Sequence, residues 1–184
     1  MLQNMPPEKA YRLLESGPVV LVSTRSAGRA NVMTMGFHMM LQHEPPLVGC
    51  VIGPWDHSYA AVCETGECVL GIPTAELAEQ VTRIGNCSGA EVDKFKQFGL
   101  TALPAATVDA PLVAQCLANL ECRVVDRTLA TRYSFFVLEV TKIWIDADKA
   151  ERRLIHHAGD GLFIADGDTI DMSRHMTRWR YLMD

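Results

Sequence analysis

The sequence lacks the glycine-rich motifs that mark several common enzyme classes. No G-x-G-x-x-G follows its first apolar run, which disfavours a dinucleotide site of the Rossmann type. It also has no G-x-x-x-x-G-K-[ST] loop for nucleoside triphosphates and no G-x-S-x-G elbow for a serine nucleophile. No side chain stands out as a catalytic acid or base, so the catalytic residues stay unassigned.

Long runs of one residue kind are also missing. No stretch reaches the roughly 18 to 20 apolar residues that a membrane-spanning helix needs, and the first residues contain no signal-peptide core. No basic run exists and the net charge is −5, so nucleic acid is not expected as a partner. We therefore expect a cytoplasmic protein with no nucleic-acid or membrane partner.

Paired cysteines are absent as well. None of the six cysteines forms a C-x-x-C pair, and most have apolar neighbours, where a thiol behaves as a small hydrophobic group. Reduced structural thiols are therefore favoured over disulfides or metal ligands. His156 and His157 are adjacent, so on a strand their side chains point to opposite faces, and no metal site is expected.

The sequence does contain a series of β-prone runs separated by turns and prolines. The runs cover residues 19–24, 30–40, 45–54, 67–73, 117–128 and 133–146. The first two are joined by a short turn in which Gly28 can take a positive φ, so they are expected to pair as an antiparallel hairpin. Helical patterns are short and cover residues 8–17, 59–66, 75–84 and 93–98, with Ser58 and Thr74 as expected helix starts.

Six or seven strands with hairpin connections predict a mainly β fold, a closed antiparallel β-barrel with α insertions. A parallel sheet would need a crossover helix between most strands. The whole chain, 1–184, fits a single domain. From about residue 155 we expect a C-terminal hairpin that turns at Asp166-Gly167, followed by a short helix or an extended arm.

Three polar segments are candidates for a binding site. Residues 31–36 place hydrogen-bonding groups beside methionines on the second strand. Residues 52–59 form a strand-to-helix loop, where amides at the helix start attract phosphate and His57 can add positive charge. Residues 85–89 are small enough for their amides to approach an anion, which Lys94 can pair with. Taken singly, each segment also fits an ordinary strand, a capped helix or a surface loop.

An ordered set of motifs runs from about Pro18 to Asp146. It comprises P-V-V-L-V-S-T, A-N-V-M-T-M, P-P-L-V-G-C-V-I-G-P, T-G-E-C-V-L-G-I-P, S-G-A-E-V-D-K-F, G-L-T, D-A-P-L and N-L-E-C-R-V-V. This set resembles the flavin reductase-like family with the FMN-binding split barrel, which includes the flavoredoxins. The resemblance implies a Greek-key-like split barrel and a homodimer with FMN held near the subunit interface.

The resemblance also implies which residues would hold FMN. The strand segment would line the flavin ring, the strand-to-helix loop would approach the ribityl chain and phosphate, and the third segment would complete the site. In chain order the implied cofactor-binding residues are Asn31, Met33, Thr34, Met35, Val51, Ile52, Gly53, His57, Ser58, Asn86, Cys87, Ser88 and Lys94.

Two departures from the family pattern bear on the reaction. Family members often carry Arg or Lys where this chain has Trp55-Asp56-His57, and Asp56 would oppose a phosphate unless it points away. Tyr133 and Ser134 stand where reductases carry a histidine that can face the nicotinamide. We therefore expect a flavoredoxin-like protein that transfers electrons through bound FMN, supplied by a redox partner protein or NAD(P)H. The alternatives are an NAD(P)H-dependent flavin reductase, a non-redox flavin-binding protein and a split barrel that has lost flavin.

Overall fold

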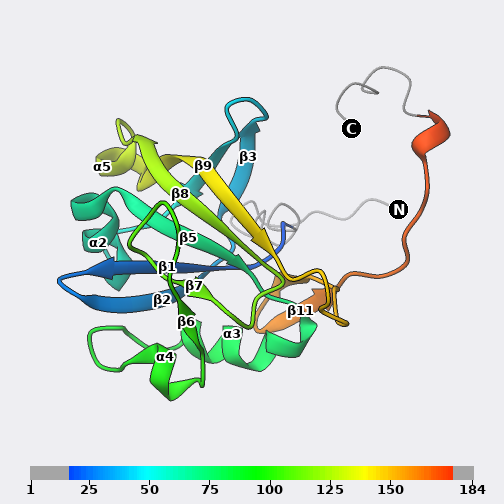
Figure 1. The fold of residues 1–184 in the computed structure, drawn as a ribbon, viewed down its shortest axis with the longest axis horizontal. Coiled ribbons are helices and arrows are strands. Elements are labelled where there is room, and N and C mark those ends of the chain that lie inside the picture. Colours follow the sequence, from blue (N-terminus) through cyan, green and yellow to red (C-terminus); the bar gives the residue numbers. More distant parts are fainter. Residues whose placement is uncertain (1–16, 176–184) are drawn as a thin grey trace, which may run out of the picture.

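The computed structural model describes residues 17–175, and its centre is a seven-stranded antiparallel sheet (Figure 1). The strand order in this sheet is β2-β1-β5-β8-β9-β4-β3. The strands are β1 (Val20–Ser26), β2 (Arg29–Met35), β3 (His38–Gln42), β4 (Leu47–Val51), β5 (Glu67–Ile72), β8 (Ala118–Asp126) and β9 (Phe135–Ile145). Every pairing is antiparallel, which confirms the mainly β fold expected from the sequence.

Short helices and two small hairpins surround this sheet. The helical elements are α2 (His57–Thr65), η2 (Ala75–Leu77), α3 (Ala78–Gly85), α4 (Lys94–Gln97), α5 (Ala130–Tyr133) and η3 (Ser173–His175). The small hairpins pair β6 (Ala102–Leu103) with β7 (Leu112–Val113), and β10 (Ile155–Gly159) with β11 (Leu162–Ala165). In Figure 1 the helices α3 and α4 lie along one side of the β1-β2 hairpin, and α2 and α5 lie toward one end of the barrel.

Strand β1 shows why an almost continuous apolar run forms a strand here. Val20 and Val22 belong to the cluster inside the barrel, whereas Val19 and Leu21 belong to a second cluster with Val81 of α3. Because successive side chains alternate between faces, both faces of β1 are buried. Each such side chain contributes about 1.5 to 3 kcal/mol when it is fully buried.

Three cysteines lie inside the barrel, where they pack as small apolar groups. Cys50, Cys68 and Cys122 are fully buried, and Cys68 lies directly opposite Cys122 in the β5-β8 pair. Burial raises the pKa of the Cys50 thiol to about 12, and the adjacent Cys122 adds to the effect. The Cys50 thiol is therefore protonated at neutral pH, and all three cysteines are free and buried in the core.

The barrel is split between β2 and β3, which stand at the two ends of the strand order. The sequence predicts one strand over residues 30–40, and this prediction is wrong at its centre because the chain turns at Gly36-Phe37. The amide of His38 donates to the carbonyl of Gly36 at 3.2 Å, and the amide of Val51 donates to that of Phe37 at 3.0 Å. Because of this turn, one continuous stretch of chain forms both β2 and β3, which are the two edge strands of the sheet.

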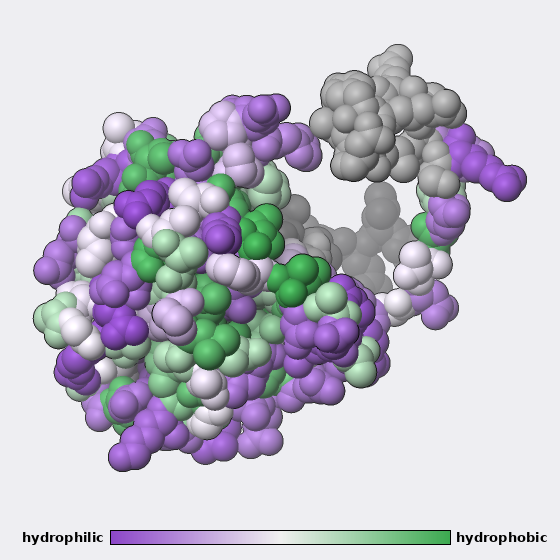
Figure 2. Space-filling view, in the orientation of Figure 1, coloured by the Kyte–Doolittle hydropathy of each residue, from purple (hydrophilic) through white to green (hydrophobic). Residues whose placement is uncertain are grey.

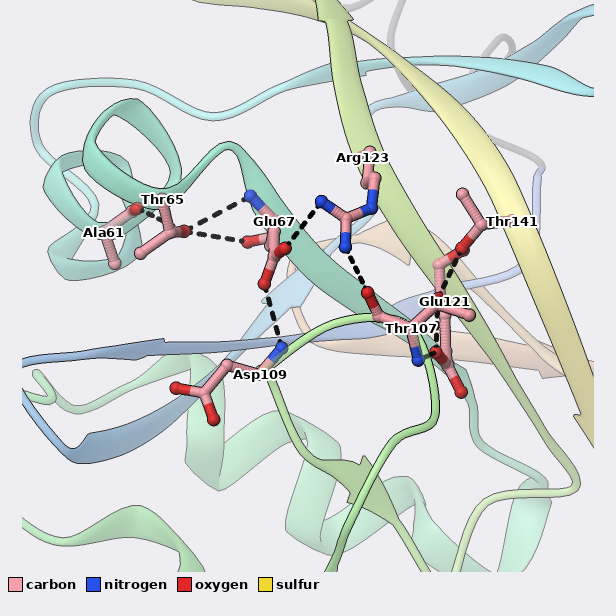
Figure 3. A network of polar contacts seen from close by, with 8 residues as sticks. All are labelled: Ala61, Thr65, Glu67, Thr107, Asp109, Glu121, Arg123 and Thr141. Atoms are coloured by element: carbon pink, nitrogen blue, oxygen red, sulfur yellow. Dashed lines mark hydrogen bonds and ion pairs between the residues drawn. The ribbon is translucent and has the colours of Figure 1, made fainter.

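A buried carboxylate holds the connection between β6 and β7 against the barrel (Figure 3). Both carboxylate oxygens of Glu121 on β8 accept hydrogen bonds, from the amides of Ala106 and Thr107, the hydroxyl of Thr107 and the indole of Trp144, at 2.5 to 2.9 Å. Nearby, the carboxylate of Glu67 on β5 accepts a hydrogen bond from the amide of Asp109 at 2.8 Å and forms an ion pair with Arg123 at 2.9 Å. These bonds replace the hydration that the buried carboxylate of Glu121 loses.

The C-terminal hairpin exists, but its expected turn is wrong. The chain reverses between β10 and β11 at Asp160-Gly161, where both residues have positive φ (54° and 78°), and not at Asp166-Gly167. Asp166 instead accepts a hydrogen bond from the amide of Leu154 at 3.0 Å and contacts His156 at 2.7 Å. Asp166 therefore closes the base of the hairpin.

Two further expectations concern helices. Helix α2 begins at His57 after the N-cap residue Asp56, so Ser58 is not the cap; it lies in the first turn and is buried. The helix expected over residues 8–17 lies almost wholly outside the described residues, and so does most of the expected terminal arm. In residues 17–175 no helix is long and apolar enough to cross a membrane.

Candidate functional site

A cavity of about 530 Å³ lies where three separate segments meet: strand β2, the loop after β4, and the connection from α3 to α4. We call it the main cavity, and its volume is within the usual range for small-molecule sites. Its lining residues are Asn31, Met33, Thr34, Trp55, Asp56, His57, Ile84, Gly85, Asn86, Cys87, Ser88, Gly89, Glu91 and Lys94.

The main cavity brings together residues from all three segments that the sequence singles out. Eight of the thirteen expected residues line it: Asn31, Met33, Thr34, His57, Asn86, Cys87, Ser88 and Lys94. Met35 and Val51 instead line a smaller pocket beside it, which we call the edge pocket and which also includes Phe37. Ile52 and Ser58 are buried, and Gly53 lies beneath the indole of Trp55.

Ser58 supports the cavity wall from behind. Its hydroxyl accepts a hydrogen bond from the side-chain amide of Asn31 at 2.9 Å, and the hydroxyl of Thr24 lies 3.4 Å away. All three side chains are buried, so Asn31 has a defined orientation at the cavity surface. The residue expected to cap a helix therefore positions a residue of the cavity.

Gly89 is the point where the third segment touches the other two. A Cβ at this position would lie 2.1 Å from Oδ1 of Asn31 and 2.6 Å from Cδ2 of His57. Such distances are far inside van der Waals contact, so only glycine fits without displacing its neighbours. Gly89 belongs to the candidate segment 85–89, but it is not among the thirteen cofactor-binding residues that the resemblance implies.

Lys94 is buried at the first position of α4. Its Nζ donates to the carbonyl of Ile84 at 2.9 Å, near the end of α3. Burial lowers the pKa of Lys94 below its ordinary value, and the nearby Cys87 and Asp56 act in the opposite direction. The side chain of Asn86 adds a bond of 2.8 Å to the carbonyl of Thr82, so the segment is anchored to α3 at two points.

The loop after β4 is compact, and its carboxylate turns inward. Oδ2 of Asp56 accepts from the amide of Gly53 at 2.8 Å, so Asp56 is bound within its own loop. The ring of Trp55 covers Gly53, where a Cβ would lie 2.2 Å from the indole. Trp55 is nevertheless 77% exposed and lines both the main cavity and the edge pocket.

Two further pockets adjoin the main cavity. A pocket of about 360 Å³, here the hairpin pocket, shares Thr34, Gly85 and Asn86 with it. The C-terminal hairpin contributes His157 and Phe163 to its wall, with ring centroids 5.1 Å apart. A third pocket of about 190 Å³ shares Asn31, His57 and Gly89 with the main cavity. In residues 17–175 there is no group of three or more side chains suited to hold a metal ion.

Sequence comparison gives the family. The model of the flavin reductase like domain matches residues 12–161. An uncharacterized protein of Archaeoglobus fulgidus is 33% identical over 143 residues, which is 78% of this chain and 75% of that protein.

Comparison of structures agrees. An FMN-binding domain of a flavin reductases-like enzyme from Shewanella baltica superposes with a TM-score of 0.79 at 30% identity, covering 91% of this chain and 95% of that one. Flavoredoxin of Desulfovibrio vulgaris superposes at 0.77 and 22% identity, covering 85% and 90%, and so shares the fold. The chain therefore belongs to the flavin reductase-like domain family, and its fold is the split barrel of that family.

Proposed function

We propose that the protein binds one FMN per subunit in the main cavity and transfers electrons through it, as a flavoredoxin-like protein. The observation that carries the proposal is the meeting of β2, the loop after β4 and the α3-α4 connection around one opening of about 530 Å³. The Shewanella relative, which binds FMN by its name, supports the choice of this cofactor.

The lining of the main cavity suits a flavin. A flavin has a flat apolar ring with polar edges, and the cavity offers the thioether of Met33 together with the polar groups of Asn31 and Thr34. Small residues from Gly85 to Gly89 let backbone groups approach a ligand closely. Asp56 is turned toward Gly53, so it is not aimed at an incoming anion.

The flavin, when bound, supplies the reversible redox chemistry. The chain's own residues bind and orient it. Ser58 holds Asn31 in place, Gly89 permits the close approach of two walls, and Lys94 anchors the third wall to α3. The proposal places the protein in the reducing cytoplasm, where its six cysteines stay as free thiols.

We propose further that the protein is a homodimer that pairs through β3. Four apolar side chains at or just before this edge strand are between 43% and 58% exposed: Phe37, Met39, Met40 and Leu41. An edge strand with exposed apolar groups favours pairing with another chain. Phe37 also lines the edge pocket beside the main cavity, so a partner seated here would cover the open side of the site. On the face shown in Figure 2, by contrast, hydrophobic residues are interspersed with polar ones.

An NAD(P)H-dependent flavin reductase is the second candidate. The hairpin pocket favours it, because a pocket of about 360 Å³ with the rings of His157 and Phe163 in its wall leaves room for a second ring beside the main cavity. In this case the donor would bind directly, and no partner protein would be needed.

Anaerobic reduction separates these functions. The purified protein should show the visible absorption of flavin, and the released cofactor should elute as FMN. Bleaching within seconds of adding NADH or NADPH would identify a reductase. An unbleached flavin that dithionite reduces and air reoxidises while it stays bound would identify a carrier. Flavin that is released when NADH or NADPH reduces it would indicate a reductase that uses FMN as its substrate. Bound flavin that dithionite does not reduce would contradict electron transfer and indicate a non-redox binding protein.

A further inference from the structure

The third pocket beside the main cavity has a different electrostatic character from its neighbour. We call it the arginine pocket; it is lined by Thr24, Ser26, Arg29, Ala30, Asn31, His57, Ala60, Ala61 and Gly89. Asn31, His57 and Gly89 also line the main cavity, so the two spaces meet at these residues. A ligand that fills the main cavity can therefore extend into the arginine pocket past Asn31 and His57.

The charged groups are distributed unevenly between the two spaces. The main cavity is lined by Glu91 and by Asp56, whose carboxylate is bound to the amide of Gly53, together with Lys94, whose Nζ is bound to the carbonyl of Ile84. The arginine pocket is lined by Arg29 and His57, and no carboxylate is among its lining residues. The acid nearest in the hydrogen-bond network is Glu64, which accepts from the hydroxyl of Ser26 at 2.5 Å. A phosphate is therefore better accommodated beside Arg29 than beside Lys94.

The local fold explains why Arg29 reaches this position. Arg29 is the first residue of β2 and lies opposite Ser26, directly after the turn at Ala27-Gly28, where both residues have positive φ (47° and 74°). Arg29 and Asn31 are two residues apart on one strand, so their side chains project from the same face. The hairpin thus places Arg29 and Asn31 together in the lining of the arginine pocket, and Asn31 also lines the main cavity.

We propose that Arg29 binds the phosphate group of the flavin nucleotide, with His57 at the shared wall. This inference rests on the proposed flavin site in the main cavity and adds the residue that selects a phosphorylated flavin. It also explains how phosphate can bind although the loop at Trp55-Asp56-His57 has no Arg or Lys, because the cation comes from the neighbouring strand. Lys94 in turn anchors the third wall and does not select for phosphate.

The test compares FMN with riboflavin, which differ only by the phosphate. Quenching of flavin fluorescence gives both dissociation constants for wild type, Arg29→Ala and Lys94→Met. Arg152→Ala is a charge-matched control, because Arg152 is exposed and its guanidinium makes only long hydrogen bonds of 3.5 Å to two backbone carbonyls.

We expect Arg29→Ala to weaken FMN binding by about 10- to 100-fold, the effect of losing a charge-assisted hydrogen bond. Riboflavin binding should stay within about twofold, whereas Lys94→Met should weaken both flavins by a similar factor. An unchanged preference for FMN over riboflavin in Arg29→Ala would overturn the inference, as would loss of this preference in Lys94→Met. Wild-type protein that binds neither flavin would overturn the proposed function itself.

Discussion

Gly89 and Asn31 are in direct contact, and the contact leaves no room for a side chain at position 89. A Cβ there would lie 2.1 Å from Oδ1 of Asn31. Since Asn31 is also held by Ser58, it cannot turn away without losing a buried hydrogen bond. The width of the main cavity is therefore set by a contact between residues 58 positions apart in the sequence.

This contact predicts that Gly89→Ala weakens flavin binding. The added methyl group must displace Asn31 or the loop that carries Gly89, and overpacking of this kind costs about 1 to 3 kcal/mol. We expect FMN affinity to fall about 10-fold or more while the melting temperature falls by only a few degrees. The control is Gly167→Ala, because a Cβ at 167 meets nothing within 4 Å. Equal affinity in the two variants would show that the contact does not shape the site.

Ser58→Ala tests whether Ser58 acts through Asn31. The substitution leaves the buried side-chain amide of Asn31 without its acceptor, which costs about 1 to 3 kcal/mol in stability. It should also weaken FMN binding by several-fold, although Ser58 does not line the main cavity. In a double-mutant cycle, Asn31→Ala with Ser58→Ala should weaken binding little more than Asn31→Ala alone. Additive effects in the cycle would indicate that the two side chains act independently.

The buried carboxylate of Glu121 predicts a pH dependence of stability. Burial alone would raise the pKa of Glu121, but hydrogen bonds from Thr107, from Trp144 and from the amide of Ala106 outweigh it and lower the pKa from 4.5 to about 2. Its folded-state pKa is thus below the unfolded one, so its stabilisation is present above about pH 4.5 and is lost as the pH falls toward 2.

Glu121→Gln is the variant that checks this dependence. At pH 7 we expect it to lower the free energy of unfolding by about 1 to 3 kcal/mol, because charge-assisted bonds are lost. The difference from wild type should shrink as the pH falls from 4.5 toward 2 in denaturant unfolding curves. Glu44→Gln, which removes an exposed carboxylate, should show neither effect. A difference that stays constant with pH would contradict the assigned role.

The exposed edge at β3 predicts a change of oligomeric state. We expect wild type to scatter light as a particle of twice the chain mass of 20.4 kDa, and Met40→Asp to scatter as a monomer. A buried unpaired carboxylate at an interface costs several kcal/mol, enough to dissociate a dimer at micromolar concentration. Ile170→Asp serves as a control, because Ile170 is 79% exposed and lies outside the strands. A wild-type monomer would contradict the proposed dimer.

Much of the fold is predictable from the sequence because its strands carry their own signals. The run around Val20 and Leu21 is β-prone along its whole length, and the turn at Gly28 fixes its antiparallel partner. The two Asp-Gly pairs near the C-terminus show the limit. Either pair could form a hairpin turn by its local sequence. Long-range contacts determine which one does. The amide of Val19 donates a hydrogen bond to the carbonyl of Ile155 at 2.8 Å and so fixes the start of β10.

The candidate site, like the fold, is only partly predictable from the sequence. Its three segments are recognisable because small, polar and soft residues interrupt apolar runs, and the main cavity contains part of each. The sequence does not reveal which members face the cavity. Ile52 and Ser58 are buried, while Arg29 reaches the site because β2 lies beside the start of α2. Such contacts depend on the folded arrangement and leave no local pattern.

The most direct test of the central claim is a titration of flavin-free protein with FMN, followed by fluorescence quenching and by the change in visible absorption. The account predicts saturable binding that ends at one FMN per chain, and binding to Gly89→Ala that is weaker by about 10-fold or more. Absence of quenching by correctly folded wild-type protein, with no flavin present as purified, would contradict it.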